Sequence, residues 1–446
     1  MNRKITYTTT LILFAVAVFF IFWKYKSNDK PKTAIEYKLL PRPGSSALTA
    51  EWAKTEKNAA DLHNVLKKNP DDLKSKLAMA SLFIQEARIT GNHGYYDMAA
   101  MKYVDEVLAK EPSNFLGLIF KSIVSLSQHH FAEGIMFANQ AQRVNPNNAY
   151  VYGLLVDGNV EMGDYAMAVA NSDKMVGIRP DTKSYSRISY LREIHGDYPG
   201  AIEAMKMAID AGPPGEEATE WCRVQLGGLF ENTGQLKEAE MQYAIALERR
   251  PGYGHALAGL GHIAMGNKQY EQAITYYKQA DVAMDDYAWK EELARLYLLT
   301  GQKDKANDAT DDIVDELTKA AEEGEESINH HGDKELAEVY LMKGDYSKAL
   351  NHALAEHNRR PENIDVAGTT AWVYYLKNDQ NNAIKFLETA LRTGSKNPTL
   401  LCRAAHIYAK AGDKAKAKSL FTEALKNNPN IELKLKEESI KMAALL

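Results

Sequence analysis

The chain has 446 residues, of which 25% are charged and 45% apolar, and its formal net charge is −5. This length exceeds one ordinary globular core and predicts several domains or a repeat array. The small net charge argues against nucleic-acid binding, which favours a clustered basic face. The only cysteines, Cys222 and Cys402, lie far apart outside any CxxC pair. A disulfide framework and a thiolate zinc site are therefore not expected.

The chain begins with a short tail, 1–4, followed by an uncharged apolar run at 5–23. At about 1.5 Å per residue this run would span roughly 28 Å, close to the thickness of a bilayer's hydrocarbon core. It therefore predicts a transmembrane anchor. A cleaved signal peptide is the alternative, but the only small-x-small triplet, at 15–17, is followed by six more apolar or aromatic residues.

Beyond the first hundred residues the sequence repeats itself. Between the prolines lie turns in which a glycine precedes a polar residue, such as MGDYAMA at 162–168 and KGDYSKA at 343–349. Glycine suits the left-handed cap that ends one helix before the chain reverses. Successive prolines are spaced by 33 or 34 residues at Pro112, Pro146, Pro180 and Pro213. A sequence period of this length predicts stacked helical hairpins.

The repeated unit resembles the tetratricopeptide repeat, a family whose pattern places apolar, small and aromatic residues at fixed slots. The resemblance covers residues 70 to 431 and implies an all-α superhelical solenoid. The whole pattern resembles membrane-anchored tetratricopeptide-repeat proteins of bacterial envelopes. The matching residues are Leu257, Leu260, Gly261, Ala264, Ala273, Tyr277 and Ala280 in one unit, and Leu401, Ala404, Ala405, Tyr408, Ala417, Phe421, Ala424 and Pro429 in another.

Ten units are predicted, and a solenoid needs terminal caps because its end faces would otherwise expose the core. The units start near Leu73, Phe115, Ala149, Thr182, Glu220, Gly254, Tyr287, His330, Ile364 and Pro398. The predicted organisation is a flexible tether (24–47), a leading helix (48–69), about seven repeats (70–318), an irregular break (319–330), about three repeats (331–430) and a capping helix (431–446).

The resemblance also implies a function. First helices of these repeats line the inside of the superhelix, and certain slots on them contact a protein or peptide ligand. We therefore expect a non-catalytic interaction scaffold in envelope assembly or secretion. Lys183 and Arg187 match part of the carboxylate clamp of chaperone-binding repeats, but the rest of that clamp is missing. The slots select Leu116, Ile119, Ile123, Tyr150, Asp157, Tyr190, Trp221, His255, His262, Arg295, Trp372, Tyr375 and His406.

Two histidine pairs are the best candidates for a metal site. Within His129–His130 and His330–His331, neighbouring side chains on a helix would point about 100° apart and cannot share one ion. Asp333 and Glu335 follow the second pair closely, but no HExxH is present. Exposed polar turns are the preferred interpretation, so no metal, cofactor, catalytic residue or nucleic-acid partner is expected. An enzyme or metal-binding protein whose site forms only in the folded solenoid remains the alternative.

The charges around the apolar run bear on which side of the membrane the solenoid would lie. Two basic residues precede the apolar run and six follow it before residue 43, which the positive-inside rule assigns to a cytoplasmic solenoid. A basic start followed by an apolar run is equally typical of exported chains. Because of the envelope resemblance, we expect a single-pass membrane protein with an extracytoplasmic, periplasmic solenoid.

Overall fold

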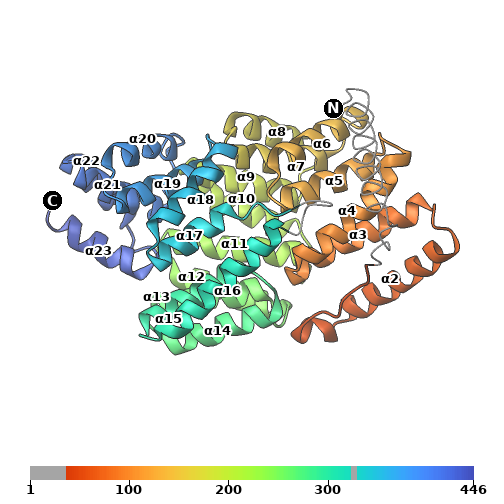
Figure 1. The fold of residues 1–446 in the computed structure, drawn as a ribbon, viewed down its shortest axis with the longest axis horizontal. Helices are drawn as coiled ribbons and strands as arrows, with labels where there is room; N and C mark the ends of the chain where they lie inside the picture. Colours follow the sequence, from red (N-terminus) through yellow and green to blue (C-terminus); the bar gives the residue numbers. More distant parts are fainter. Residues whose placement is uncertain (1–36, 323–328) are drawn as a thin grey trace, which may run out of the picture. The chain divides into compact units, whose positions relative to one another are not determined.

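A computed structural model describes residues 37–322 and 329–446 (Figure 1). The chain divides into two compact units, Met1–Leu40 and Pro41–Leu446. Only residues 37–40 of the first unit are described, and every described helix belongs to the second unit. The predicted tail and anchor, 1–4 and 5–23, lie outside the described residues.

The second unit consists of paired helices, and the described residues contain no strand. The all-α solenoid is confirmed. A short 3-10 helix, η1 (Gly44–Leu48), and helix α2 (Ala50–Lys68) precede the repeats, and α23 (Leu433–Ala443) follows them. The first helices of the ten repeats are α3 (Leu73–Thr90), α5 (Phe115–Ser127), α7 (Ala149–Met162), α9 (Thr182–Ile194), α11 (Glu217–Asn232), α13 (Gly254–Gly266), α15 (Tyr287–Leu299), α17 (Asp333–Lys343), α19 (Ile364–Leu376) and α21 (Pro398–Lys410). The second helices are α4 (His93–Lys110), α6 (Phe131–Val144), α8 (Tyr165–Ile178), α10 (Tyr198–Asp210), α12 (Leu236–Arg249), α14 (Tyr270–Ala283), α16 (Lys303–Glu322), α18 (Tyr346–Arg359), α20 (Gln380–Ala390) and α22 (Lys414–Ala424).

The predicted membrane localisation is wrong. Among the described residues, no helix combines the length and the apolarity needed to cross a bilayer. The longest helices carry too many charges. In α2, for example, Glu51, Lys54 and Glu56 all lie in the first two turns. Each such charge at a bilayer centre costs a few kcal/mol.

A Gly-Asp motif explains how several of the hairpins turn. Gly163 ends α7 in the left-handed region, with φ 81°, and Asp164 begins α8 by accepting a hydrogen bond from the backbone amide of Met167. Gly344 and Asp345 do the same between α17 and α18. Glycine removes the penalty for positive φ, and the aspartate satisfies an unpaired amide at the helix start. Two residues of sequence therefore end one helix and start the next.

Small residues let the two helices of a repeat approach closely. Ala239 and Ala273 are fully buried in the second helices α12 and α14. Gly227 and Gly261 leave room for aromatic rings: a Cβ at Gly227 would lie 2.4 Å from the Tyr243 ring. The small slots of the repeat pattern therefore exist because a tyrosine from the second helix fills the space.

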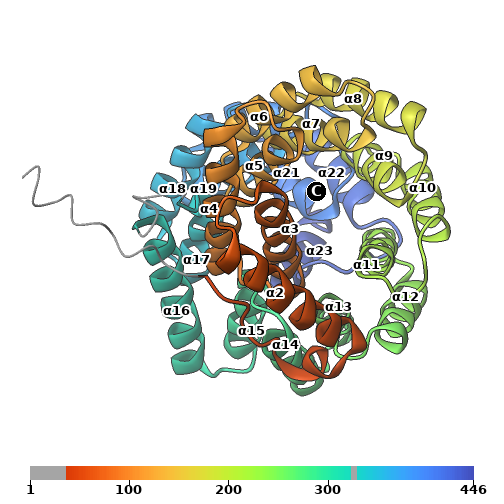
Figure 2. The same ribbon diagram turned by 90° about the vertical axis from the view of Figure 1, so that its right-hand side faces the viewer.

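The first helices form the inner wall of the superhelix. Each of α5, α7, α9 and α11 contacts the next first helix along the chain, whereas the described second helices make no comparable contacts with one another. Figure 2 shows the second helices α10, α12, α16 and α18 outside the first helices α9, α11, α17 and α19. Closer spacing on one side makes the stack curve toward the first helices.

The curvature brings repeats six places apart into direct contact. The turn after a first helix touches the loop that leads into the first helix six repeats later, and after the fifth repeat this later helix is the cap α23. We call this set of contacts the seam. The seam includes Asp285 N–H to Thr90 O (2.9 Å), His331 N–H to Gln128 O (3.2 Å), Asn363 Nδ2 to Glu161 O (3.0 Å) and Asn430 N–H to Glu231 O (3.1 Å).

Residues just before the repeats take part in this packing. The Arg42 guanidinium is buried and bonds both carboxylate oxygens of Glu86, at 2.6 and 2.8 Å. Ser45 Oγ donates to the carbonyl of Pro251, which precedes α13. The last part of the predicted tether, from Pro41 onward, is thus fixed on the solenoid by a buried ion pair.

The first and seventh repeats depart from the regular hairpin length. The first repeat is longer than the others because both of its helices are long: α3 and α4 have 18 residues each, and only Gly91 and Asn92 separate them. The acidic second helix of the seventh repeat is α16, with 20 residues. Half of the expected break at 319–330, residues 323–328, lies outside the described residues, and the two-block division remains a prediction.

Candidate functional site

Five of the predicted contact residues line one cavity on the inner face of the first superhelical turn. The cavity has a volume of about 580 Å³ and is walled by first helices α7, α9, α11 and α13. Slots separated by about three and seven residues on successive helices point the same way, so they meet on the concave side. The five are Tyr150, Asp157, Tyr190, Trp221 and His255.

Paired charges stand among these aromatic rings. Arg187 bonds the Asp157 carboxylate with two nitrogens, at 2.8 and 2.5 Å. Arg88 pairs with Glu217 at 2.7 Å and lies over the Trp221 ring. Both arginines therefore have their charge compensated inside the cavity.

Lys183 is the exception. Its ammonium lies 4.4 Å from the centre of the Tyr150 ring, and no carboxylate of the described residues lies within ion-pair distance of it. Burial lowers the pKa of Lys183, and the charges of Arg187 and Arg88 lower it further. An unpaired cation next to aromatic faces is a ready partner for a carboxylate.

Tyr190 is 42% exposed although it stands in the same concave region. Burial of the surrounding space raises the pKa of its hydroxyl well above the usual value. An aromatic ring that is partly exposed, but that stands in a concave and poorly solvated region, is typical of binding sites.

Other predicted contact residues lie elsewhere. Ile119 is 3% exposed and packs in the core, and Ile123 packs against the same cluster; Leu116 is 47% exposed. His406 is buried because α23 covers it, and its Nε2 lies 3.1 Å from Ser439 Oγ. Residues under a cap or in the core are not open to a partner.

The remaining four lie on later first helices. His262 contacts the Glu231 carboxylate at 2.6 Å, and this carboxylate raises the pKa of the imidazole to about 9 against the effect of burial. Arg295 lies 3.9 Å from Glu291 and 3.4 Å from Glu292. Trp372 and Tyr375 stack with their ring centres 4.8 Å apart.

A second cavity, of about 790 Å³, lies at the seam and is lined by residues of the first, second, seventh and eighth repeats. The two histidine pairs meet beside it: the rings of His129 and His330 are 4.4 Å apart between centres, and those of His130 and His331 are 3.9 Å apart. His129 and His330 line the cavity itself. Sequence neighbours cannot share one ion, but the seam combines one histidine from each pair.

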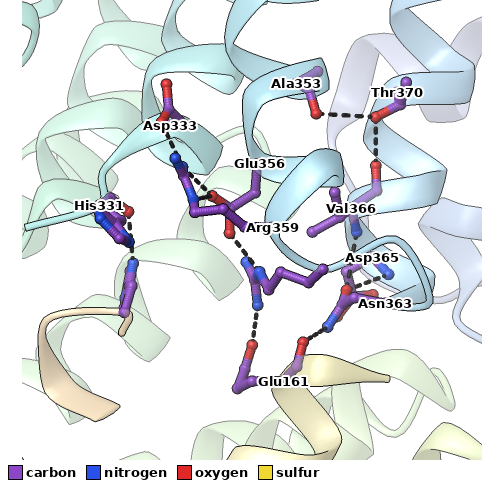
Figure 3. Close-up of polar contacts among 12 residues, drawn as sticks. Glu161, His331, Asp333, Ala353, Glu356, Arg359, Asn363, Asp365, Val366 and Thr370 are labelled. Carbon is purple, nitrogen blue, oxygen red and sulfur yellow. Dashed lines mark hydrogen bonds and ion pairs between the residues drawn. The ribbon is translucent and has the colours of Figure 1, made fainter. Parts of the chain in front are cut away.

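Ionic contacts beside the histidines hold the two turns together. Figure 3 shows Glu356 between Arg359, which also reaches Asp333, and a second arginine that contacts Glu161. This second arginine is Arg360, 2% exposed, which bonds both Glu356 and Glu161. A chain of alternating charges, buried at Glu356 and Arg360, thus connects the third repeat to the eighth.

The carboxylates of the seam cavity differ in how they are compensated. Asp285 and Glu316 both pair with Lys290. Glu291 lies near Arg295, yet burial raises its pKa to about 8. Glu335 has no ion-pair partner among the described residues, and its buried Oε2 accepts no hydrogen bond from them.

Sequence reasoning missed two features of these cavities. Lys183 has no ion-pair partner because Asp157 and Glu217 pair with arginines instead, and no local sequence pattern reveals these pairings. The meeting of His129 and His330 depends on the number of repeats in one superhelical turn. The duplicated His-His dipeptide was the only signal in the sequence.

Family models of the tetratricopeptide repeat match residues 225–288 and 398–431. The first span runs from the middle of α11 to the start of α15, and the second contains the α21–α22 hairpin. A curated relative, tetratricopeptide repeat protein 21B of Xenopus laevis, is 28% identical over 131 residues, which are 29% of this chain and 9% of the relative. The matched part thus spans less than a tenth of that relative.

Solved structures with a similar arrangement of helices include the human IFIT1 dimer with PPP-AAAA, at 15% identity and a TM-score of 0.47. The alignment covers 77% of this chain and 79% of that one. A tetratricopeptide repeat protein from Parabacteroides merdae is 19% identical with a TM-score of 0.34, over 59% of this chain and 98% of the other. The chain therefore contains tetratricopeptide repeats at 225–288 and 398–431, and its other described helical hairpins are arranged in the same way.

Proposed function

We propose that the chain is a protein-interaction scaffold whose inner cavity binds an extended protein segment carrying a carboxylate. One observation carries this proposal: the unpaired ammonium of Lys183 lies over the Tyr150 ring in a cavity that Tyr190 and Trp221 also line. Tetratricopeptide repeats typically bind proteins or peptides, and no enzyme family is indicated by the matching models. A role in envelope assembly or secretion stays a prediction.

The chemistry of the walls defines the ligand. A carboxylate near Lys183 would form a charge-assisted contact in a partly desolvated place. Aromatic or aliphatic side chains on the same segment would pack on Tyr190 and Trp221, and rigid aromatic anchors commonly dominate binding energy. Arg187 and Asp157 pair with each other in the wall of the same cavity, so neither charge is left for the ligand.

A displayed peptide library selected on the full chain tests the proposal. We expect enrichment of acidic peptides with a neighbouring aromatic or aliphatic residue, and loss of at least about tenfold in affinity for Lys183→Met and Trp221→Ala, because hot-spot truncations commonly cost more than about 1–2 kcal/mol. Met241→Ala is the matched control, since this residue is 52% exposed on the outer helix α12. Peptides that bind all four proteins equally would contradict the proposed site.

A further inference from the structure

The strongest unexplained feature is the histidine cluster at the seam. One ring nitrogen of His129, one of His330 and one carboxylate oxygen of Glu335 lie within 4.8 Å of one another. The residues come from the second and eighth repeats and line the 790 Å³ cavity. We propose that they form a Zn²⁺ site that ties two superhelical turns together, a role separate from peptide binding in the inner cavity.

The hydrogen bonding of His129 fits a metal ligand. Its Nδ1 lies 3.0 Å from the carbonyl oxygen of His331, and a carbonyl only accepts, so Nδ1 carries the hydrogen. Nε2 is left with its lone pair, the form that coordinates a metal. Metal-binding histidines generally donate their other ring N–H to a carbonyl or carboxylate, which fixes the ring.

The backbone at His129 is held in an uncommon conformation. Its φ is 63°, in the left-handed region that non-glycine residues visit rarely. It is the turn position that Gly163 and Gly344 fill in other repeats, so the conformation belongs to the hairpin turn. Here the conformation turns the side chain of His129 toward His330 across the seam, where their ring centres are 4.4 Å apart.

Glu335 supplies the third donor. Among the described residues, its buried Oε2 has no hydrogen-bond donor and its carboxylate forms no ion pair. A buried oxygen without a partner is costly unless something fills the gap. The cavity wall holds six carboxylates and two lysines, which favours entry of a cation.

Two imidazoles and one carboxylate suit Zn²⁺ in both donor type and number, with the cavity leaving room for a bound water as the fourth ligand. Ligand atoms around tetrahedral zinc are separated by roughly 3.4 Å, as follows from bonds of about 2.1 Å. The donor atoms, which lie within 4.8 Å of one another, therefore need to approach by up to about 1.4 Å. Rotation of the Glu335 side chain can provide much of this movement.

Zinc titration of the full chain, first stripped with a chelator, tests the site. Calorimetry with ZnCl₂ and elemental analysis after gel filtration should give one tightly held Zn²⁺ per chain. His330→Gln, Glu335→Gln and His129→Asn should each weaken binding by at least the roughly 10–100-fold that loss of an outer-shell partner typically costs. Asparagine is chosen at His129 because it tolerates positive φ.

His331→Gln is the matched control. It belongs to the same loop and stacks on His130, but its side chain is outside the donor set. We expect its zinc affinity to stay within about twofold of the unmodified chain. Absence of zinc binding in the unmodified chain would overturn the proposal, and so would equal affinity in Glu335→Gln, whose shape is nearly unchanged. A larger loss for His331→Gln than for His330→Gln would assign the metal to other residues.

Hydrogen exchange measures the tie between the turns. The His331 N–H bonds the Gln128 carbonyl across the seam, so its exchange reports on seam opening. We expect ZnCl₂ to slow exchange at this amide and to leave the amides of α12, on the far outer wall, unchanged. Unchanged exchange at His331 with zinc bound would exclude the tying role.

Discussion

The substitution Gly163→Ala tests the seam, because it adds one methyl group at the contact between two superhelical turns. Gly163 ends α7 with φ 81° and ψ 10°, and the methyl group of an alanine there would lie 2.3 Å from the carbonyl carbon and oxygen of Glu362 on the next turn. Gly344 ends α17 with almost the same backbone, φ 74° and ψ 10°, and its methyl group would meet nothing within 4 Å. The two substitutions therefore differ only in the clash across the seam.

The expected magnitudes separate the two variants. Both lose about 1 kcal/mol by placing alanine in the left-handed region. Gly163→Ala must in addition displace the loop that holds Glu362 by about 1 Å, and overpacking of this kind costs about 1–3 kcal/mol. The Gly163 carbonyl also accepts a hydrogen bond from Arg392 at 2.5 Å, which the displacement would stretch.

Urea unfolding followed by circular dichroism gives the free-energy difference between these variants. We expect Gly163→Ala to lose about 2–4 kcal/mol and Gly344→Ala about 1 kcal/mol. Equal losses would mean that the turns are not packed together in solution, and the seam would have to be abandoned.

Two further predictions concern single side chains. The pKa of His262 is raised to about 9 by Glu231, above the usual value of about 6.5, so the charged pair stabilises the fold fully below about pH 6.5 and this contribution is lost as the pH rises through 9. The unfolding free energy of the unmodified chain should therefore exceed that of His262→Gln at about pH 6 and approach it near pH 10; a pH-independent difference would refute the ion pair. Ala273 is fully buried between helices, so Ala273→Leu should cost about 1–3 kcal/mol by overpacking, and an unchanged melting temperature would show that the repeat phase there is wrong.

The repeat pattern of the sequence predicts much of this fold. Ala273, Tyr277 and Gly261 follow rules that act within one hairpin, where a turn, a small residue and a ring must fit together. The same rules put Tyr150, Trp221 and His255 on one face, and the structure places them around one cavity. Neighbouring repeats interact so regularly that a pattern of about 34 residues determines their packing.

The contacts between superhelical turns depend on the rotation that accumulates over many repeats. Each repeat rotates a little relative to the one before, and only the accumulated rotation decides that His129 meets His330. A small change in that rotation would place other residues opposite each other. The burial of His406 likewise depends on α23, which lies outside the repeat pattern. Local rules therefore predict hairpins but not contacts between turns.

Contacts between turns also change how the solenoid responds to force. A solenoid held only by neighbouring repeats can lengthen like a coil spring, because small changes at each interface add up along its axis. Here Arg360, Asn363 and Asn430 join the coils directly, so extension first has to break buried bonds. When the chain is pulled from its ends, we expect it to extend little until these bonds break, and to lengthen only after that.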